Sequence, residues 1–523
     1  MKFYHLLPSL IFILSGFVCN STTTGNTTEY VDSPVPESGH AERYRPSLLN
    51  TLYIPLEVEV SITNAPVNSR VWHKAKTRIV RNIVGFTAEQ TLETYKKNTN
   101  KYGSSLTLPR QEATGRFYTK KIDGRWWIID PEGYLHINRG VCSVRPGGSE
   151  NNSQANFYRF NQRFANITEW LEKTKTEFDE IGMNCSGAFS RNYYPDYQAY
   201  NKTHCESPFI LTPSFNFLAQ FSMRVGGWPR ENPRSKIGLV LHPDWENWCR
   251  EYVRSALSPY KDDPNTLGIF SDNEIEFVNV DKGEANLILP YLIKDTGSTG
   301  TYVRKWCTDN GIDPDNFSAT VQANKQFVTY AVEKYYKAVG EAIKEFDPGM
   351  LYLGSRLHGE PRNWKTIWEI AGRYCDIVSI NYYGDWSVDM KRGDGERTPT
   401  KTAKGVVPMW ETWSGKPFIV TEFYTKGIDD SDLNNESGAG IAVRNQAARA
   451  YAYQHFTLGL IEARNCVGWH WFKYQDDEPE DNSYKAANKG IYDKNFKIYP
   501  YLALYIQELN IHTYELIEFF DSE

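Results

Sequence analysis

The stretch Tyr134-Leu-His-Ile-Asn-Arg-Gly-Val-Cys-Ser-Val144 is the first of a series of apolar segments whose repetition determines the fold. It follows a turn at Pro131-Glu-Gly133, and further short runs rich in apolar residues recur along the chain, separated by helical segments and loops. With Leu135–Val144 these runs make eight, the others being Met183–Phe189, Phe209–Pro213, Leu267–Ser271, Met350–Ser355, Ile377–Asn381, Phe418–Glu422 and Val467–Phe472. Eight apolar strands that alternate with helices are typical of a parallel sheet closed into a barrel. The pattern predicts an α/β fold, specifically a (β/α)8 TIM barrel.

Helices are expected between these runs, at Ile167–Ile181, Trp245–Tyr260, Gln322–Phe346 and Ala439–Ala463. The alternative architecture is an open doubly wound sheet. That fold would need a glycine-rich phosphate-binding turn after an early strand, and the sequence has no G-x-G-x-x-G. The barrel is therefore the favoured prediction.

The chain before the barrel divides into three parts. Residues 1–19 have the charged start and short apolar run of a signal peptide, and residues 20–50 are expected to be a flexible linker. Residues 51–116 form an accessory N-terminal region, with a strand expected at 53–62 and a helix at 87–102. The catalytic barrel is assigned to residues 117–515, entered through a hairpin that turns at Asp123-Gly124.

The segment Leu14-Ser-Gly-Phe-Val-Cys19 loosely resembles a bacterial lipobox, in which Cys19 would be acylated. It departs from that pattern because Val18 stands where a small residue is usual. Two outcomes stay open, an outer-membrane lipid anchor through Cys19 and simple secretion. The protein is expected to be secreted or to be a cell-surface lipoprotein.

The composition points away from charged partners and towards sugars. A net charge of −6 gives no global attraction for nucleic acid. Fifteen Trp and 34 Tyr are many for 523 residues, and flat aromatic faces suit sugar rings, although core packing explains most of them. The ten His show no His-Glu-x-x-His spacing, so we expect neither a metal nor a cofactor. The acidic loop 476–481 is either a cation site or, more commonly for such runs, a solvated segment.

Two glutamates stand where apolar strands give way to polar loops. Gly268-Ile-Phe-Ser-Asp-Asn-Glu274 delivers an Asn-Glu pair after the fourth strand, and Lys416-Pro-Phe-Ile-Val-Thr-Glu422 delivers a Glu at the end of the seventh. Glycosidic bonds are cleaved by two carboxyl groups, one protonated and one ionised. Either glutamate alone would be weak evidence. Together, at strand ends that meet on one face of a barrel, they predict a glycoside hydrolase.

This arrangement resembles the retaining glycoside hydrolases of clan A. The resemblance implies that Glu274 is the acid/base and Glu422 the nucleophile. It further implies that Asn273 binds the sugar 2-hydroxyl, that Tyr382 or its neighbour Tyr383 supports the nucleophile, and that Trp471 or Trp469 forms the floor of the sugar site.

A closer resemblance is to the family 50 β-agarases. It is carried by Asp123-Gly-Arg-Trp-Trp-Ile-Ile-Asp-Pro-Glu-Gly-Tyr-Leu-His136 with Gly140–Val144, by Phe270–Glu274 and by Tyr352–Arg356, and it extends over much of residues 115–505. The chain departs from that family after Glu422, where Phe-Tyr-Thr-Lys-Gly427 differs from the usual stretch, and in a shortened N-terminal carbohydrate-binding-like region. The resemblance implies double displacement on agarose or a related galactan.

Four further residues are candidates for substrate binding. Arg356 and His358 follow the fifth strand and would either hydrogen-bond sugar hydroxyls, orient Glu274 or form an ion pair with Glu360. His470, flanked by two tryptophans, is either a site residue or a core histidine. Asn184 is a candidate sugar contact in the second strand.

The sequence therefore predicts an exported retaining β-glycosidase that acts on a polysaccharide or oligosaccharide, most specifically agarose. The alternatives keep the mechanism and change the sugar to porphyran, a carrageenan oligosaccharide, a β-galactoside or a β-glucan. A non-catalytic surface glycan-binding lipoprotein is the third interpretation, and it does not explain the presence of both glutamates. Endo or exo action depends on the loops at 147–164 and 278–302.

Overall fold

The computed structural model describes residues 52–61, 69–146, 154–190, 194–225, 236–277, 287–383, 386, 407–428, 433, 435–436, 438–476 and 486–522. The predicted signal peptide with Cys19 and the predicted linker lie outside these residues. Within the described part of the chain, no helix combines the length and apolar character needed to cross a membrane.

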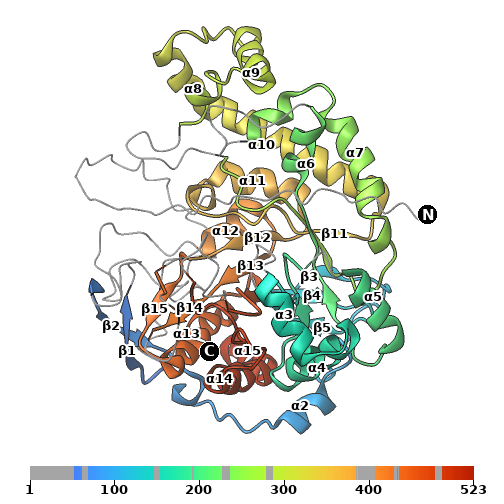
Figure 1. The fold of residues 1–523 in the computed structure, drawn as a ribbon, viewed down its shortest axis with the longest axis vertical. Coiled ribbons are helices and arrows are strands. Elements are labelled where there is room, and N and C mark those ends of the chain that lie inside the picture. The colour runs from blue at the N-terminus through green and yellow to red at the C-terminus, as the bar shows by residue number, and fades with distance from the viewer. Residues whose placement is uncertain are drawn as a thin grey trace.

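Most of the eight predicted strands lie in one parallel sheet at the centre of the molecule (Figure 1). Its spatial order is β12 (Val378–Asn381), β13 (Phe418–Phe423), β16 (Cys466–Trp471), β6 (Asn138–Val141), β7 (Cys185–Ser186) and β8 (Ile210–Leu211). Every neighbouring pair is parallel, and every residue of these strands is buried. Burial on both faces explains why strands such as β8 and β13 are largely apolar without alternation, whereas β6 also buries the polar residues Asn138 and Arg139.

A second parallel sheet has the order β11 (Leu351–Tyr352), β10 (Gly268–Ser271) and β9 (Ser214–Phe215). Two isolated parallel bridges, Leu211 with Thr266 and Leu357 with Ile380, join the two sheets, one at each edge. Each of the eight predicted runs overlaps a strand of one of these sheets. The prediction of an α/β fold built on parallel strands is confirmed.

Helices surround the strands, and α8 and α9 extend from one end of the molecule beyond α10 (Figure 1). Their bounds are α3 Gln154–Arg163, α4 Ile167–Glu180, α5 Tyr194–Thr203, α6 Phe217–Arg224, α7 Trp245–Ala256, α8 Leu289–Leu292, α9 Ser298–Asp309, α10 Phe317–Phe346, α11 Lys365–Tyr374, α12 Val407–Ser414, α13 Gln446–Glu462, α14 Pro500–Ile511 and α15 Thr513–Ser522. Short 3₁₀ helices lie at Val80–Asn82, Ile237–Leu241, Ser258–Tyr260 and Glu360–Asn363.

Two of the four helix starts predicted between the apolar runs differ from the structure. The helix expected from Gln322 begins five residues earlier, at Phe317, because the Asn316 side chain caps it by accepting the Ala319 N–H. The helix expected from Ala439 begins only at Gln446, after an Asn445 cap, because residues 441–443 form strand β15. That part of the prediction was wrong.

The accessory N-terminal region joins an insertion that follows β13. Strand β1 (Leu56–Ser61), predicted from its alternating pattern, pairs antiparallel with β2 (His73–Thr77) on one side and with β15 (Ile441–Val443) on the other. Strand β14 (Thr425–Gly427) completes this four-stranded sheet, so the region packs close to the carboxyl end of β13.

A short antiparallel meander precedes β6. It consists of β3 (Tyr118–Ile122), β4 (Arg125–Ile129) and β5 (Leu135–His136), and its first turn lies at Asp123-Gly124, both at positive φ, as the hairpin prediction requires. Helix α2 (Leu92–Asn98) is shorter than the helix expected at 87–102, because the Thr91 side chain caps it at Thr94 N–H.

Candidate active site

Glu274 lies three residues beyond the end of β10, in a turn with unusual backbone geometry. Asp272 and Glu274 both have positive φ, 57° and 51°. The Glu274 side chain is 31% exposed, and its Oε1 accepts a hydrogen bond from Asn381 Nδ2 at 2.8 Å. The same oxygen lies 3.7 Å from His358 Nδ1. Glu274 is therefore a carboxyl group that is held by neighbours and still open to solvent.

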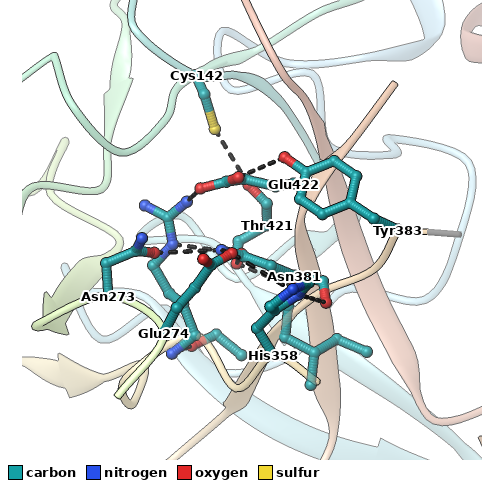
Figure 2. A network of polar contacts seen from close by, with 11 residues as sticks. Cys142, Asn273, Glu274, His358, Asn381, Tyr383, Thr421 and Glu422 are labelled. Atoms are coloured by element: carbon teal, nitrogen blue, oxygen red, sulfur yellow. Dashed lines mark hydrogen bonds and ion pairs between the residues drawn. The ribbon is translucent and has the colours of Figure 1, made fainter. Parts of the chain in front are cut away.

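Glu422 lies inside strand β13 and is only 4% exposed. One carboxylate oxygen forms an ion pair with Arg356 Nη2, and the other accepts a hydrogen bond from the Tyr383 hydroxyl (Figure 2). Burial and the charge of Glu422 raise the pKa of Tyr383 well above its ordinary value, so this hydroxyl stays a donor. A buried carboxylate with a cation and a hydroxyl donor is stabilised in its ionised form.

Asn381, the last residue of β12, connects the two glutamates. Its Nδ2 donates to Glu274 Oε1 and to Asn273 Oδ1 (3.1 Å), and its Oδ1 accepts from the Thr421 hydroxyl at 2.9 Å. Arg356 Nε lies 3.4 Å from the same Oδ1. One buried amide thus links Asn273 and Glu274 to the Arg356–Glu422 pair (Figure 2).

Arg356 is fully buried beside Glu422, at φ 58°, with its guanidinium 4.7 Å from the Phe189 ring centroid and 5.5 Å from that of Phe270. The structure pairs Arg356 with Glu422, a role that was not predicted for it. The predicted pair with Glu360 involves a side chain outside the described part of the structure. Within the described residues its Nη1 has no hydrogen-bond partner. The site therefore contains a buried donor beside Glu422.

His358 lies at the same cluster, partly exposed, with Nδ1 3.4 Å from the Asn381 carbonyl oxygen and 3.7 Å from Glu274. The ring also packs edge-on against Tyr383, with centroids 5.8 Å apart. His358 thus lies on the solvent-exposed side of the cluster, beside Glu274, and its contact with a sugar stays a prediction.

Two adjacent tyrosines were candidates for support of Glu422, and the structure brings the hydroxyl of Tyr383 to that carboxylate. The Tyr382 ring instead packs against Trp410 and Phe456, with centroid separations of 6.2 and 5.6 Å. Tyr382 contacts Glu422 through the backbone, where its N–H donates to the Glu422 carbonyl at 2.9 Å.

The three consecutive candidates on β16 are all buried. Trp469 Nε1 donates to the Tyr453 hydroxyl (2.9 Å), and Trp471 Nε1 donates to the Lys489 carbonyl (2.8 Å). His470 Nε2 is hydrogen-bonded to Asn138 Oδ1 at 2.6 Å, and burial, helped by the Arg356 charge, lowers its pKa to about 3. The structure gives each side chain a protein partner, and their contact with a sugar stays a prediction.

The structure does not bring Asn184 to this cluster. Asn184 precedes β7 at its amino end, where its Oδ1 accepts the Arg139 N–H (2.9 Å) and its Nδ2 donates to the Ile137 carbonyl (3.2 Å). Glu274 and Glu422 lie at the carboxyl ends of parallel strands, which is the opposite edge of the sheet.

Only Asp476 of the acidic loop 476–481 is described, and it is buried. It accepts hydrogen bonds from Asn488 Nδ2, the Gly490 N–H and the Tyr499 hydroxyl. Burial raises its pKa to about 6, against the opposing effect of Arg449. Across the described ranges, no three His, Cys, Asp or Glu side chains cluster as a metal site would require.

Comparison with known proteins places this site in context. No family profile matches the chain. Beta-agarase B of Vibrio sp. (strain JT0107) is 23% identical over 492 residues, covering 77% of this chain and 48% of that protein. Beta-agarase A of the same organism is 23% identical over 193 residues, or 37% of this chain and 18% of that protein. The chain thus spans about half the length of the first relative and less of the second.

Solved structures give a fuller match. The crystal structure of BpGH50 is 38% identical, with a TM-score of 0.77, and covers 90% of this chain and 96% of that one. The agarase AgWH50C has the same kind of fold, at 17% identity and a TM-score of 0.60, over 80% of this chain and 66% of that one.

Proposed function

Because the chain belongs to glycoside hydrolase family 50, as its 38% identity to BpGH50 over 90% of its length shows, we propose that this β-agarase-like glycoside hydrolase cleaves a galactan such as agarose by a retaining mechanism. The two Vibrio relatives are beta-agarases, which supports agarose as the substrate. The observation that carries the mechanism is the pair Glu274 and Glu422, joined through Asn381 and Arg356.

Different surroundings suit the two glutamates to different roles. Glu422, buried between the Arg356 cation and the Tyr383 hydroxyl, is suited to be the ionised nucleophile. Glu274 receives a neutral amide hydrogen bond and is open to solvent, which suits a group that gives and takes a proton. Asn273, whose side-chain oxygen accepts a hydrogen bond from Asn381, is the residue proposed to bind the sugar 2-hydroxyl.

The proposed reaction is a double displacement. A Glu422 oxygen attacks the anomeric carbon while Glu274 donates its proton to the leaving sugar oxygen, which gives a glycosyl-enzyme and a free alcohol. Water then attacks the same carbon, Glu274 removes the water proton, and the bond to Glu422 breaks. The anomeric configuration is retained after the two inversions.

We also propose that the two parallel sheets form one closed (β/α)8 barrel of clan A, over residues 117–515. The support is strand order. Each of the eight strands pairs with the next of the eight in the chain, either through a ladder of hydrogen bonds or through one of the two isolated bridges, and the last strand, β16, pairs with the first, β6. The order is β6, β7, β8, β10, β11, β12, β13 and β16. A closed barrel would bring Glu274 and Glu422 to one face.

Export of the enzyme, either by secretion or as a surface lipoprotein through Cys19, is a further part of the proposal. It is supported by the apolar run at residues 6–18 and by the substrate, since an extended polysaccharide is met outside the cell. Cell fractionation of wild type beside Cys19→Ser tests it. A membrane-bound wild type with a released variant supports the anchor, both proteins in the medium support secretion, and both in the cytoplasm overturn export.

The decisive test is product analysis on agarose, porphyran, carrageenan and β-glucans, with wild type, Glu422→Ala, Glu274→Gln and the surface control Glu369→Gln. We expect neoagaro-oligosaccharides of retained β configuration by early-time ¹H NMR, unchanged in the control and lost in both site variants. Cleavage of another glycan would correct the substrate alone. An inverted product, or activity that survives in Glu422→Ala, would overturn the mechanism.

A further inference from the structure

Asp272, two residues before Glu274, is buried at the end of β10 and has no part in the reaction described above. It is 6% exposed. Its positive φ, together with that of Glu274, gives a turn that residues other than glycine rarely adopt. Such a conformation persists only where the surrounding structure holds it. The turn that carries Glu274 therefore needs an anchor.

The Asp272 carboxylate has the contacts of such an anchor. Its two oxygens lie 3.0 and 3.3 Å from the Leu218 N–H, in the first turn of α6, so that Asp272 caps a helix 54 residues away in sequence. Its Oδ2 also accepts a hydrogen bond from the Tyr335 hydroxyl of α10 at 2.8 Å. One carboxylate thus connects β10 to two helices.

The backbone on each side of this carboxylate is held as well. The Tyr335 oxygen lies 2.8 Å from Ser271 Oγ, which in turn is 2.5 Å from the Tyr352 hydroxyl. The Asp272 N–H donates to the Phe215 carbonyl at 2.5 Å. Glu274 is less constrained, because its N–H bond to Ser355 is long (3.3 Å) and its side chain is open to solvent. Asp272 is thus the buried, fixed end of this turn, and the Glu274 carboxyl, which accepts a hydrogen bond from Asn381, is its partly exposed end.

We propose that Asp272 is a positioning residue for Glu274: bound to α6 and Tyr335, its buried carboxylate holds the left-handed turn that directs Glu274 to the leaving oxygen. The inference rests on the acid/base role proposed for Glu274. It is consistent with the unfavourable burial of this group, which raises the pKa of Asp272 to about 7 although the Tyr335 hydrogen bond lowers it.

The test compares two leaving groups in Asp272→Asn and Tyr335→Phe. The first substrate is the oligosaccharide that wild type cleaves, whose sugar alkoxide needs a proton in order to leave. The second is a dinitrophenyl β-glycoside of the same sugar, assayed with azide, because dinitrophenolate leaves without a proton and azide needs no base. We expect Asp272→Asn to lower kcat about 10- to 100-fold on the oligosaccharide, with KM changed less than about twofold. On the aryl substrate with azide, we expect kcat to fall by less than about threefold.

Tyr335→Phe removes one hydrogen bond from Asp272, so it should show the same leaving-group dependence at a smaller size, and it carries the test if Asp272→Asn fails to fold. The matched control is Asp130→Asn, another buried aspartate, which accepts the N–H groups of Glu132 and Tyr134 before β5. It should lower Tm and affect both substrates equally.

Equal losses on both substrates in the Asp272 and Tyr335 variants would overturn the inference, as would full activity on the oligosaccharide. Glu274→Gln, assayed alongside, separates this inference from the proposed function. If Glu274→Gln shows leaving-group dependence and the Asp272 variant does not, only the positioning role fails. If Glu274→Gln shows none, the acid/base assignment itself fails.

Discussion

The two adjacent tyrosines after β12 have different surroundings and should respond differently to loss of the hydroxyl. Tyr383→Phe removes a donor to Glu422, whose charge changes during attack, so we expect kcat to fall about 10- to 100-fold. Tyr382→Phe keeps the ring that packs against Trp410 and Phe456, and we expect its kcat to stay within about threefold of wild type. Steady-state kinetics on the same oligosaccharide measures both. Equal losses would contradict the assignment of Tyr383.

The buried pair of Arg356 and Glu422 gives a second prediction. Arg356→Met fills similar volume and removes the cation from a carboxylate that is almost fully buried, so we expect a loss of stability of about 3 kcal/mol and of activity of at least about 100-fold. Urea unfolding and kinetics measure the two effects. The control Arg250→Met breaks an exposed pair with Glu345 and should cost less than about 1 kcal/mol. Equal stability losses in the two variants would contradict the prediction.

At the scale of single residues, the sequence predicts a candidate side chain that stands alone at the end of a strand more readily than it distinguishes between two candidates that are adjacent in the chain. Glu274 and Glu422 could be predicted as catalytic residues because each follows an apolar run, and the structure brings both into one cluster. The choice between Tyr382 and Tyr383 depends on how the chain leaves β12, where strand periodicity no longer applies. Asn381 was missed, although it ends a predicted run, because its importance lies in contacts with Glu274 and Arg356 that only the folded chain brings together.

At the scale of elements, eight parallel strands could be predicted because burial on both faces leaves a signal in each short run. Strand β15 could not, because it has only three residues, 441–443, and lies between β14 and β1, the latter about 380 residues earlier in the chain. The residues that precede α13 suit a helix locally, and tertiary pairing decides against it.

That pairing can be tested at Val60, which is buried in β1 opposite Val443 in a small second core with Val58, Ala75 and Ile441. Val60→Ala leaves a cavity there, so we expect a loss of about 2 kcal/mol in the free energy of unfolding. The neighbouring Glu59→Ala, on the exposed side of β1, should change it by less than about 0.5 kcal/mol. Urea unfolding of both variants checks the prediction, and similar values for the two would argue against a buried β1–β15 face.

At the scale of the whole molecule, buried titratable groups set opposing pH dependences of stability. Burial lowers the pKa of His136, His455 and His470, so these histidines are neutral in the folded protein, whereas the unfolded chain takes up protons below about pH 6.5. The contribution of these neutral histidines to the free energy of unfolding is complete above that pH and is lost as the pH falls. Burial raises the pKa of Asp272 to about 7 and of Asp476 to about 6, so their contribution is present below about pH 4 and is lost as the pH rises.

Substitution of His455 removes one of these pH-dependent contributions to stability. Its Nδ1 accepts the Arg78 N–H at 2.9 Å, and an asparagine oxygen can occupy nearly the same position. Because the folded protein no longer excludes a proton at residue 455, His455→Asn should lose less stability than wild type between pH 6 and pH 4, by up to about 1.4 kcal/mol per pH unit. Urea unfolding at several pH values measures this slope. Between pH 7.5 and 8.5, where histidine is already neutral in both states, the two proteins should have parallel curves. A slope unchanged below pH 6 would show that His455 is protonated in the folded protein, and that acid stability is governed by other groups.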